Sequence, residues 1–153
     1  PDFYKKINAI DILNTSSFEI FNHNMETVKR LYRDVRPGAN FIRSLNLLKK
    51  MKVKNDKIFT KSGIMIGLGE TYEETLNIMD TLLENDVDFI TIGQYLQPSS
   101  GHQELKKYYS LSEFAFLEEK AWDLGFSMVS CSPLTRSSYH ADEDFKKLKA
   151  CCA

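Results

Sequence analysis

The chain has 153 residues and a formal net charge of −1, with 42% hydrophobic and 27% charged residues. This composition is typical of one folded domain with a sizeable core, and it excludes the disordered class. A charge this close to zero gives no electrostatic attraction toward nucleic acid or an anionic membrane, and no run approaches the ~18 apolar residues of a membrane span. We therefore expect no nucleic-acid partner and no membrane partner.

Two further features of the whole chain limit the function classes. The cysteines are Cys131, Cys151 and Cys152, an odd number that does not fit a secreted disulfide framework. The three histidines lie far apart, so the sequence has no zinc site of familiar spacing. The sequence begins with Pro1 and has no visible targeting segment, and we interpret it as a segment of a longer protein whose compartment it does not reveal.

The spacing of apolar residues predicts helices and strands that alternate along most of the chain. The predicted elements are a helix over 4–13, a strand over 18–21, a helix from Met25 to Val35, a helix over 41–53, a strand over 59–66, a helix over 72–84, a strand over 87–92, a helix between Ser110 and Gly125, and a strand over 126–130. From Asp142 onward we expect a charged helical tail. The folded unit is therefore predicted to cover 1–141 and the tail 142–153.

Three helix starts have sequence signals of their own. Thr71 and Glu74 form a Thr-x-x-Glu capping box, and Ser110 and Glu113 form a Ser-x-x-Glu capping box. Asn24 is the predicted N-cap of the helix that begins after it.

The alternation of strands and helices at intervals of roughly 30–40 residues predicts a parallel sheet with right-handed crossovers. Four strands are too few to close an eight-stranded barrel, which typically takes about 250 residues. The predicted fold class is therefore α/β, either an open parallel sheet or part of a (β/α) barrel, with the first strand as an edge.

Polar residues gather directly after the predicted strands. The four segments are Asn22–Glu26, Gly67–Glu70, Gln94–Gln97 and Arg136–His140. Because the carboxyl ends of parallel strands lie on one rim, where α/β folds hold their ligands, we expect these segments to form a binding site.

The stretch 59–70 joins a strand to a Gly-x-Gly-Glu turn. Gly63, Gly67 and Gly69 place three glycines within seven residues. Glycines at these positions allow positive φ and let a flat ligand lie against the backbone. The alternative is a tight strand-to-helix connection that needs glycines for its own geometry.

The rim residues offer chemistry for a polar ligand. Asn22, Asn24 and Glu26 suit ribose hydroxyls and a cationic amine, although Asn24 is equally suited to a helix cap. Lys61 lies within a strand, so its ammonium either meets a ligand carboxylate or extends toward the edge. Glu70 is either a ligand contact or an acid near a helix N-terminus. The sequence shows no catalytic triad, and we assign no catalytic residue.

Six stretches occur together in order over nearly the whole chain before about Asp142. They are Asn22-His23-Asn24-Met25-Glu26-Thr27, Val35-Arg36-Pro37-Gly38-Ala39, Thr60-Lys61-Ser62-Gly63, Gly67-Leu68-Gly69-Glu70-Thr71, Thr91-Ile92-Gly93-Gln94-Tyr95-Leu96-Gln97-Pro98 and Pro133-Leu134-Thr135-Arg136-Ser137-Ser138-Tyr139-His140-Ala141. In this order they closely resemble lipoyl synthase, a radical S-adenosylmethionine (SAM) enzyme family. The resemblance implies the second half of a radical SAM barrel, a partial (β/α) barrel with parallel strands.

The resemblance also implies an activity and its cofactors. Family enzymes hold two 4Fe–4S clusters, of which one cleaves SAM to a 5′-deoxyadenosyl radical and the other is consumed as the sulfur source. The radical abstracts hydrogens from carbons 6 and 8 of an octanoyl chain on a carrier-protein lysine, and a sulfur inserted at each carbon gives the lipoyl group. The implied partner is an octanoylated lipoyl-carrier protein or domain. The implied setting is a monomer in the bacterial cytoplasm or in a mitochondrial or plastid matrix.

Residue by residue, the resemblance implies a cofactor-binding set. Gly63, Met65, Gly67 and Glu70 are similar to the GxIxGxxE element that packs the adenine, with methionine in the isoleucine place. The resemblance extends the set to Asn22, Asn24 and Glu26, as contacts for the ribose and the methionine moiety. The position of Lys61 and Gln94 at the rim adds these two residues to the predicted cofactor-binding set.

Ser138 matches the serine ligand of the auxiliary cluster, with Arg136 beside it. A serine oxygen is a harder ligand than a thiolate, so it gives a weaker bond suited to a cluster that is taken apart. The sequence departs from the family in lacking both cysteine motifs, which its three cysteines do not replace. We therefore expect this polypeptide alone to be inactive, and the activity to be that of a longer parent enzyme.

Two other interpretations remain open from the sequence. The first is a phosphate-binding (β/α) barrel lyase or isomerase that uses the Gly67–Gly69 turn as an anion-binding nest. The second is a non-catalytic module that only docks a carrier protein.

Overall fold

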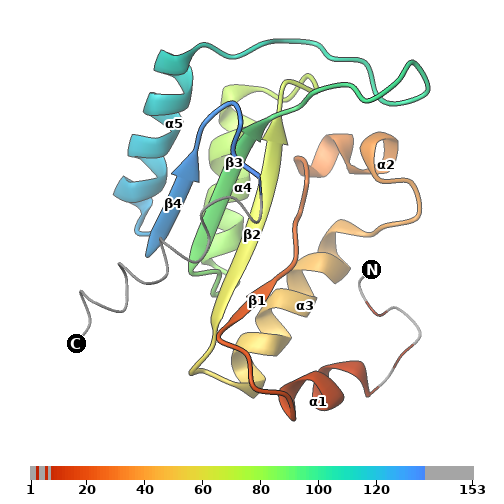
Figure 1. Cartoon of the computed structure of the whole chain (residues 1–153), viewed down its shortest axis with the longest axis vertical. Helices are drawn as coiled ribbons and strands as arrows, with labels where there is room; N and C mark the ends of the chain where they lie inside the picture. The colour runs from red at the N-terminus through yellow and green to blue at the C-terminus, as the bar shows by residue number, and fades with distance from the viewer. Residues whose placement is uncertain (1–2, 4–5, 7, 137–153) are drawn as a thin grey trace.

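A computed structural model of the chain describes Phe3, Lys6 and residues 8–136. The fold is mixed α/β with a four-stranded parallel sheet (Figure 1). The elements are α1 Ala9–Asn14, β1 Ile20–Asn22, the 3₁₀ helix η1 Lys29–Leu31, α2 Tyr32–Val35, α3 Phe41–Lys54, β2 Phe59–Ile66, α4 Tyr72–Leu83, β3 Phe89–Gln94, α5 Leu111–Leu124 and β4 Met128–Cys131. No helix among the described residues has the length and apolar character that crossing a membrane requires.

The strand order in the sheet equals the order along the chain, β1-β2-β3-β4, and every pair is parallel. Right-handed crossovers that all step in the same direction place their helices on one face of the sheet. Helices α3, α4 and α5 accordingly lie together on one face (Figure 1). The predicted parallel α/β architecture is confirmed, and β1 is an edge strand as expected.

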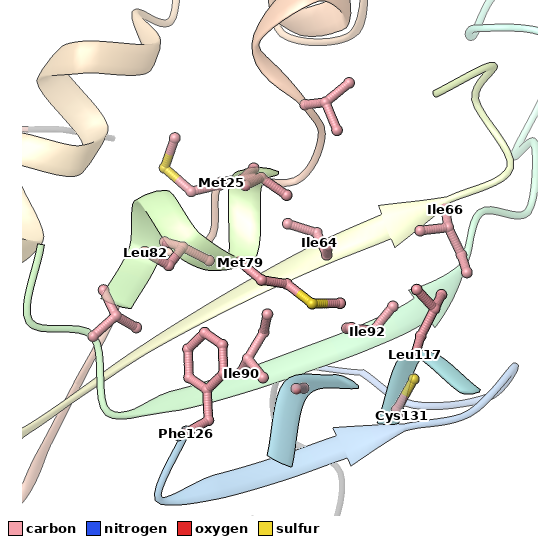
Figure 2. Close-up of a cluster of buried hydrophobic side chains, with 14 of the residues drawn as sticks. Met25, Ile64, Ile66, Met79, Leu82, Ile90, Ile92, Leu117, Phe126 and Cys131 are labelled. Carbon is pink, nitrogen blue, oxygen red and sulfur yellow. The ribbon is translucent and has the colours of Figure 1, made fainter. Parts of the chain in front are cut away.

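The main core lies between this face and the helices (Figure 2). Side chains alternate along a strand, so every second residue of β2 and β3 points toward the helices. These residues are Ile64, Ile66, Ile90 and Ile92, each at most 3% exposed. Fully burying one such side chain stabilises the fold by about 1.5–3 kcal/mol.

The opposite face of the sheet is apolar at its amino-terminal end. Phe89 and Met128 are buried there, with Ile20 and Phe59 packed against them. The rings of Phe59 and Phe89 stack with their centroids 4.8 Å apart. Toward the carboxyl ends of the strands the same face becomes polar, and this change places the candidate site.

The predicted helix ends are confirmed where the signal is local. The Thr71 side chain accepts from the Glu74 amide at 3.2 Å, and the Glu74 carboxylate accepts from the Thr71 amide at 2.8 Å. Ser110 and Glu113 form the same reciprocal pair at 3.3 and 2.8 Å. Gly125 ends α5 in the left-handed conformation, as expected of a C-cap glycine.

The helix predicted from Met25 to Val35 ends where expected but starts too early, and Asn24 is not its N-cap. Helical turns begin only at η1, and Glu26 is instead paired with β2. The Glu26 amide donates to the Gly63 carbonyl at 2.9 Å, and the Met65 amide donates to the Glu26 carbonyl at 2.8 Å. The helical spacing of apolar residues was misleading because Met25 and Val28 reach the core from a non-helical segment, while Leu31 and Tyr32 reach the same core from the helical turns that follow.

Other boundaries are shifted rather than wrong. Helix α1 starts at Ala9, and β1, β3 and β4 each lie one or two residues further along than predicted. Pairing with β2 sets the register, because Phe89 lies opposite Lys61 while Asp88 is held by Lys52 at 2.8 Å. The predicted boundary between 1–141 and the tail 142–153 lies outside the described residues.

Candidate functional site at the carboxyl edge of the sheet

A cavity of about 240 Å³ lies at the carboxyl edge, on the face opposite the helices. Each of the four strands, or the segment that follows it, supplies part of the wall. The lining residues are Asn24, Glu26, Gly63, Ile64, Met65, Thr91, Gly93, Thr135 and Arg136. The volume lies below the ~300–1,000 Å³ typical of small-molecule pockets. Two of the four predicted post-strand segments reach the cavity, one through Asn24 and Glu26 and the other through Arg136, while residues within β2 and β3 supply the rest of the wall. Of the predicted cofactor-binding residues, the cavity brings together Asn24, Glu26, Gly63 and Met65.

Close approach of neighbouring segments explains why glycine lines this wall. A Cβ added at Gly63 would lie 2.7 Å from Thr91 Oγ1 and 3.0 Å from Asn24 Oδ1. A Cβ added at Gly93 would overlap the Thr135 carbonyl oxygen. Any larger side chain at either position would push the wall apart or fill the cavity.

The β1 side of the cavity holds a buried oxygen that has no hydrogen-bond partner. Asn24 Nδ2 donates to Glu26 Oε1 at 3.3 Å, while Asn24 Oδ1 finds no partner among the described residues. Arg36 fixes the local backbone by donating to the Asn24 carbonyl at 3.0 Å. Buried polar atoms are almost always hydrogen-bonded, so an unsatisfied acceptor at a cavity wall can accept from a ligand donor.

Glu26 adds a second unusual feature to the same wall. Its φ is +70°, a conformation that few residues other than glycine adopt and that is enriched at binding sites. The two backbone hydrogen bonds to β2 described above hold it there. The fold thus sustains this conformation with the Glu26 side chain lining the cavity.

The β4 side of the cavity contributes a cation. Arg136 lines the cavity and is exposed, and its Nη1 donates to the Thr135 carbonyl at 2.7 Å and the Pro133 carbonyl at 3.3 Å. The cavity therefore has a carboxylate on one side and a guanidinium on the other. Such a pair suits a ligand that itself has an ammonium and a carboxylate.

The glycine turn after β2 has a different character, because its polar groups bond one another. Glu70 is 8% exposed, and its Oε1 accepts from the Gly67 amide at 2.6 Å and the Tyr109 hydroxyl at 3.0 Å. Its Oε2 accepts from the Leu68 amide at 2.9 Å. The amides of a potential anion-binding nest are therefore already bonded to a carboxylate. Burial and the negative charge of Glu70 raise the pKa of Tyr109, so its hydroxyl stays protonated and donates.

Residues 105–109 form a strap that lies against this turn. Hydrogen bonds with the Gln94 side chain hold the strap there. Gln94 Nε2 donates to the Ile66 carbonyl at 3.1 Å and the Lys107 carbonyl at 3.0 Å, and Gln94 Oε1 accepts from the Tyr109 amide at 2.9 Å. A Cβ at Gly67 would lie 2.5 Å from the Lys107 carbonyl oxygen. The space beside Gly67 is thus taken by the chain's own strap, as the tight-connection alternative requires.

The other predicted residues lie at different depths. Lys61 is 2% exposed within β2, and the strand's alternation places it on the cavity face, two residues before Gly63. Asn22 is exposed at the end of β1. Ser138 lies outside the described residues, as do Cys151 and Cys152.

Cys131 belongs to the core rather than to a site. Its Sγ donates to the Phe114 carbonyl at 3.3 Å, and burial, with a smaller contribution from the charge of Glu118, raises the pKa of the thiol to about 12. Within residues 8–136 no group of three or more His, Cys, Asp or Glu side chains is placed to hold a metal ion.

Sequence reasoning missed four contributors to this edge. Thr91 and Gly93 were recoverable, because period-two alternation from the core residues of β3 places them on the cavity face. Thr135 and Tyr109 had no usable signal, since their roles depend on loops folding back over the strand ends. A scan of the sequence against known protein-family models finds no match, so a function has to be argued from the site itself.

Proposed function

We propose that this chain is the SAM-binding half of a radical SAM enzyme of the lipoyl synthase type. The parent enzyme would insert two sulfur atoms, at carbons 6 and 8, into an octanoyl chain bound to a lipoyl-carrier protein or domain. The observation that supports the proposal best is the cavity at the carboxyl edge. Segments that resemble the family motifs supply its wall, and Asn24 offers it an unsatisfied acceptor.

The sheet topology supports a half-barrel. In a (β/α) barrel the strands follow one another in chain order with all helices outside, whereas a doubly wound sheet reverses its order and has helices on both faces. Here the order is β1-β2-β3-β4 with α3, α4 and α5 on one face. We infer that the polar face opposite the helices is the interior of the parent barrel.

The cavity residues fit the functional groups of SAM. Glu26 would bind the ammonium, Asn24 would accept from a ribose hydroxyl, and Arg136 would pair with the carboxylate. Gly63 and Met65 would flank the adenine, the first by leaving space and the second through a polarisable apolar side chain. When bound, SAM supplies the 5′-deoxyadenosyl group for hydrogen abstraction, and these residues bind and orient it.

The described residues do not fit an iron–sulfur cluster. Cys131 is buried against α5 with a protonated thiol, and residues 8–136 contain no group of potential metal ligands. In our proposal the thiolates for both 4Fe–4S clusters belong to a preceding half of the parent enzyme. Ser138 would be this chain's contribution to the auxiliary cluster, on the sequence motif alone.

The geometry disfavours the phosphate-binding alternative. A phosphate at the glycine turn would need the Gly67 and Leu68 amides, and both already donate to the Glu70 carboxylate. A phosphate would also meet the like charge of that carboxylate at close range. The docking module is separated from the enzyme by the first test below.

The first test is the coding sequence upstream of the Pro1 codon. We expect it to encode a CxxxxCxxxxxC motif and a CxxxCxxC motif, because the enzyme needs thiolates for two clusters. Absence of both motifs would contradict the enzyme class and favour the docking module.

The second test uses the full-length parent enzyme. We expect Ser138→Ala to abolish most lipoyl formation while SAM cleavage continues, because only the auxiliary cluster loses a ligand. Ser137→Ala is the matched control and should leave both reactions near the wild-type level. An unchanged lipoyl yield in Ser138→Ala would defeat the ligand assignment.

A further inference from the structure

We propose that Tyr109 is a positioning residue for the ligand cavity, which it controls through Glu70 and the glycine turn without touching the ligand. The inference rests on the proposed function, because it concerns affinity for SAM at the same cavity. It assigns a role to the strap, residues 105–109, which none of the family-like motifs contains.

Hydrogen bonds and ring contacts hold Tyr109 in place at the end of the strap. Its hydroxyl donates to Glu70 Oε1 at 3.0 Å, and its amide donates to Gln94 Oε1 at 2.9 Å. Its ring meets the edge of Phe114 with centroids 6.3 Å apart, and the Lys107 ammonium lies 4.3 Å from its ring centroid. Because both the backbone and the ring are held, the hydroxyl has a defined position relative to Glu70.

The Glu70 carboxylate links the Tyr109 hydroxyl to the backbone of the glycine turn by hydrogen bonds. Its Oε1 is shared by the Tyr109 hydroxyl and the Gly67 amide, and its Oε2 accepts from the Leu68 amide. Gly67 has a φ of +109°, and glycine moves easily between positive and negative φ. The hydrogen bonds to Glu70 are therefore what holds the turn in this conformation. Loss of the hydroxyl would free one side of the carboxylate to rotate away from the two amides.

The turn is connected to the cavity through β2. Met65 lines the cavity and lies two residues before Gly67. The Tyr95 amide donates to the carbonyl of the intervening Ile66 at 2.8 Å, and Gln94 Nε2 donates to the same oxygen. A looser turn would therefore let the last residues of β2 move, and with them the wall that faces the ligand.

The experiment compares Tyr109→Phe with Tyr108→Phe in the full polypeptide that contains this chain. Tyr108 is the neighbouring strap residue and is 70% exposed, so its variant controls for tyrosine loss in the strap. We expect Tyr109→Phe to raise the Kd for SAM about fivefold or more, a typical size for coupling between linked sites, with less than a twofold change in Tyr108→Phe. Equal Kd values for the wild type and Tyr109→Phe would overturn the proposal.

A second readout separates this inference from the proposed function. Hydrogen exchange at the Gly67 and Leu68 amides, measured by NMR without SAM, should be faster in Tyr109→Phe than in the wild type or Tyr108→Phe. Unchanged exchange would overturn the role of Tyr109 whatever the SAM result. Failure of the wild type to bind SAM would instead contradict the proposed function, and the exchange rates would still decide whether Tyr109 orders the turn.

A double-mutant cycle distinguishes positioning from general stability. If Tyr109 acts through Glu70, then the variant with both Tyr109→Phe and Glu70→Gln should bind SAM no more weakly than Glu70→Gln alone. Additive losses of affinity would show that Tyr109 acts by another route, and would contradict the proposal.

Discussion

Two regions of the same sheet edge resemble each other in sequence and differ in structure. The network region consists of Glu70, Gln94 and Tyr109, and the side-chain polar atoms of all three are hydrogen-bonded within the chain. The cavity region contains Asn24, whose buried side-chain oxygen has no partner among the residues that the structure describes, and Glu26, whose backbone has a positive φ. A polar residue at a strand end is therefore no sign of a ligand by itself, and what separates the two regions is whether its hydrogen bonds are already made.

The largest expected loss of stability comes from a substitution at Gly67, in the turn that the network region holds. Alanine there would combine an unfavourable φ of +109° with a Cβ 2.5 Å from the Lys107 carbonyl oxygen. We expect Gly67→Ala to lower the free energy of unfolding by about 3 kcal/mol or more, from backbone strain and overpacking together. Urea denaturation followed by circular dichroism measures this loss.

Gly38→Ala is the matched control for that substitution. Gly38 has a φ of +88° with nothing within 4 Å of an added Cβ, so alanine there causes backbone strain without overpacking. Its expected loss is about 1 kcal/mol. Equal losses at Gly38 and Gly67 would show that the strap does not press on the turn.

The next effect concerns the buried amide of Gln94, which is 3% exposed. Gln94→Leu would leave the Lys107 carbonyl and the Tyr109 amide without their partner in a region shielded from water. We expect a loss of about 2–4 kcal/mol in the free energy of unfolding. Gln97→Leu, in the exposed loop that follows, should lose less than about 1 kcal/mol. Similar losses for both variants would contradict the network assignment.

The cavity region should respond in the opposite way. Asn24 Oδ1 has no described partner to lose, and the contact from its Nδ2 to Glu26 is long. We expect Asn24→Ala to change the free energy of unfolding by less than about 1 kcal/mol while weakening SAM binding about tenfold. Thermal denaturation and equilibrium dialysis measure the two quantities. A large loss of stability with unchanged SAM binding would show that Asn24 stabilises the fold and does not bind the ligand.

The smallest expected effect concerns the ion pair between Arg30 and Glu74, at the start of α4. Arg30 donates to both Glu74 carboxylate oxygens and to the Gly69 carbonyl. The hydrogen bond from Arg30, supported by that from the Thr71 amide, lowers the pKa of Glu74 to about 2. A lowered pKa in the folded state means that the stabilisation is complete above the ordinary pKa of about 4.5, and is lost as the pH falls from there toward 2.

Glu74→Gln tests this pH dependence, because glutamine still completes a capping box. The variant should be less stable than the wild type at pH 7 by under about 1 kcal/mol, since the pair is exposed to solvent. The difference should shrink as the pH falls below 4.5. A difference that stays constant down to pH 2 would show that the charge of Glu74 contributes nothing.

Local signals predicted the parts of this fold that depend on local physics. The capping boxes at Thr71 and Ser110 satisfied their own helix ends, so a few neighbouring residues sufficed to place α4 and α5. The helix start predicted after Asn24 was wrong, because the apolar spacing there matches a helix while the pairing of Glu26 with Ile64 sets a non-helical backbone conformation. That pairing is a long-range contact, which spacing within one segment does not report.

The candidate site was likewise predicted only in the part that general rules for parallel sheets determine. The rule that ligands gather at the carboxyl ends of parallel strands predicted where Asn24, Glu26 and Gly63 meet. It did not predict that Glu70 bonds the turn instead, through the Gly67 and Leu68 amides. The third partner of this carboxylate, the Tyr109 hydroxyl, comes from a strap far along the chain, and no pattern within the turn reports it. Sequence therefore located the edge, and only the fold showed which polar groups remain available there.

Titration of the ¹⁵N-labelled chain with SAM decides whether the cavity, rather than the glycine turn, binds an adenosyl sulfonium ligand. We predict saturable shifts in the amide resonances of Asn24, Glu26, Gly63 and Gly93, with Glu26→Gln weakening the binding. Shifts that do not saturate would contradict the account, as would the largest shifts falling at Tyr72 and Phe116 in the groove between α4 and α5.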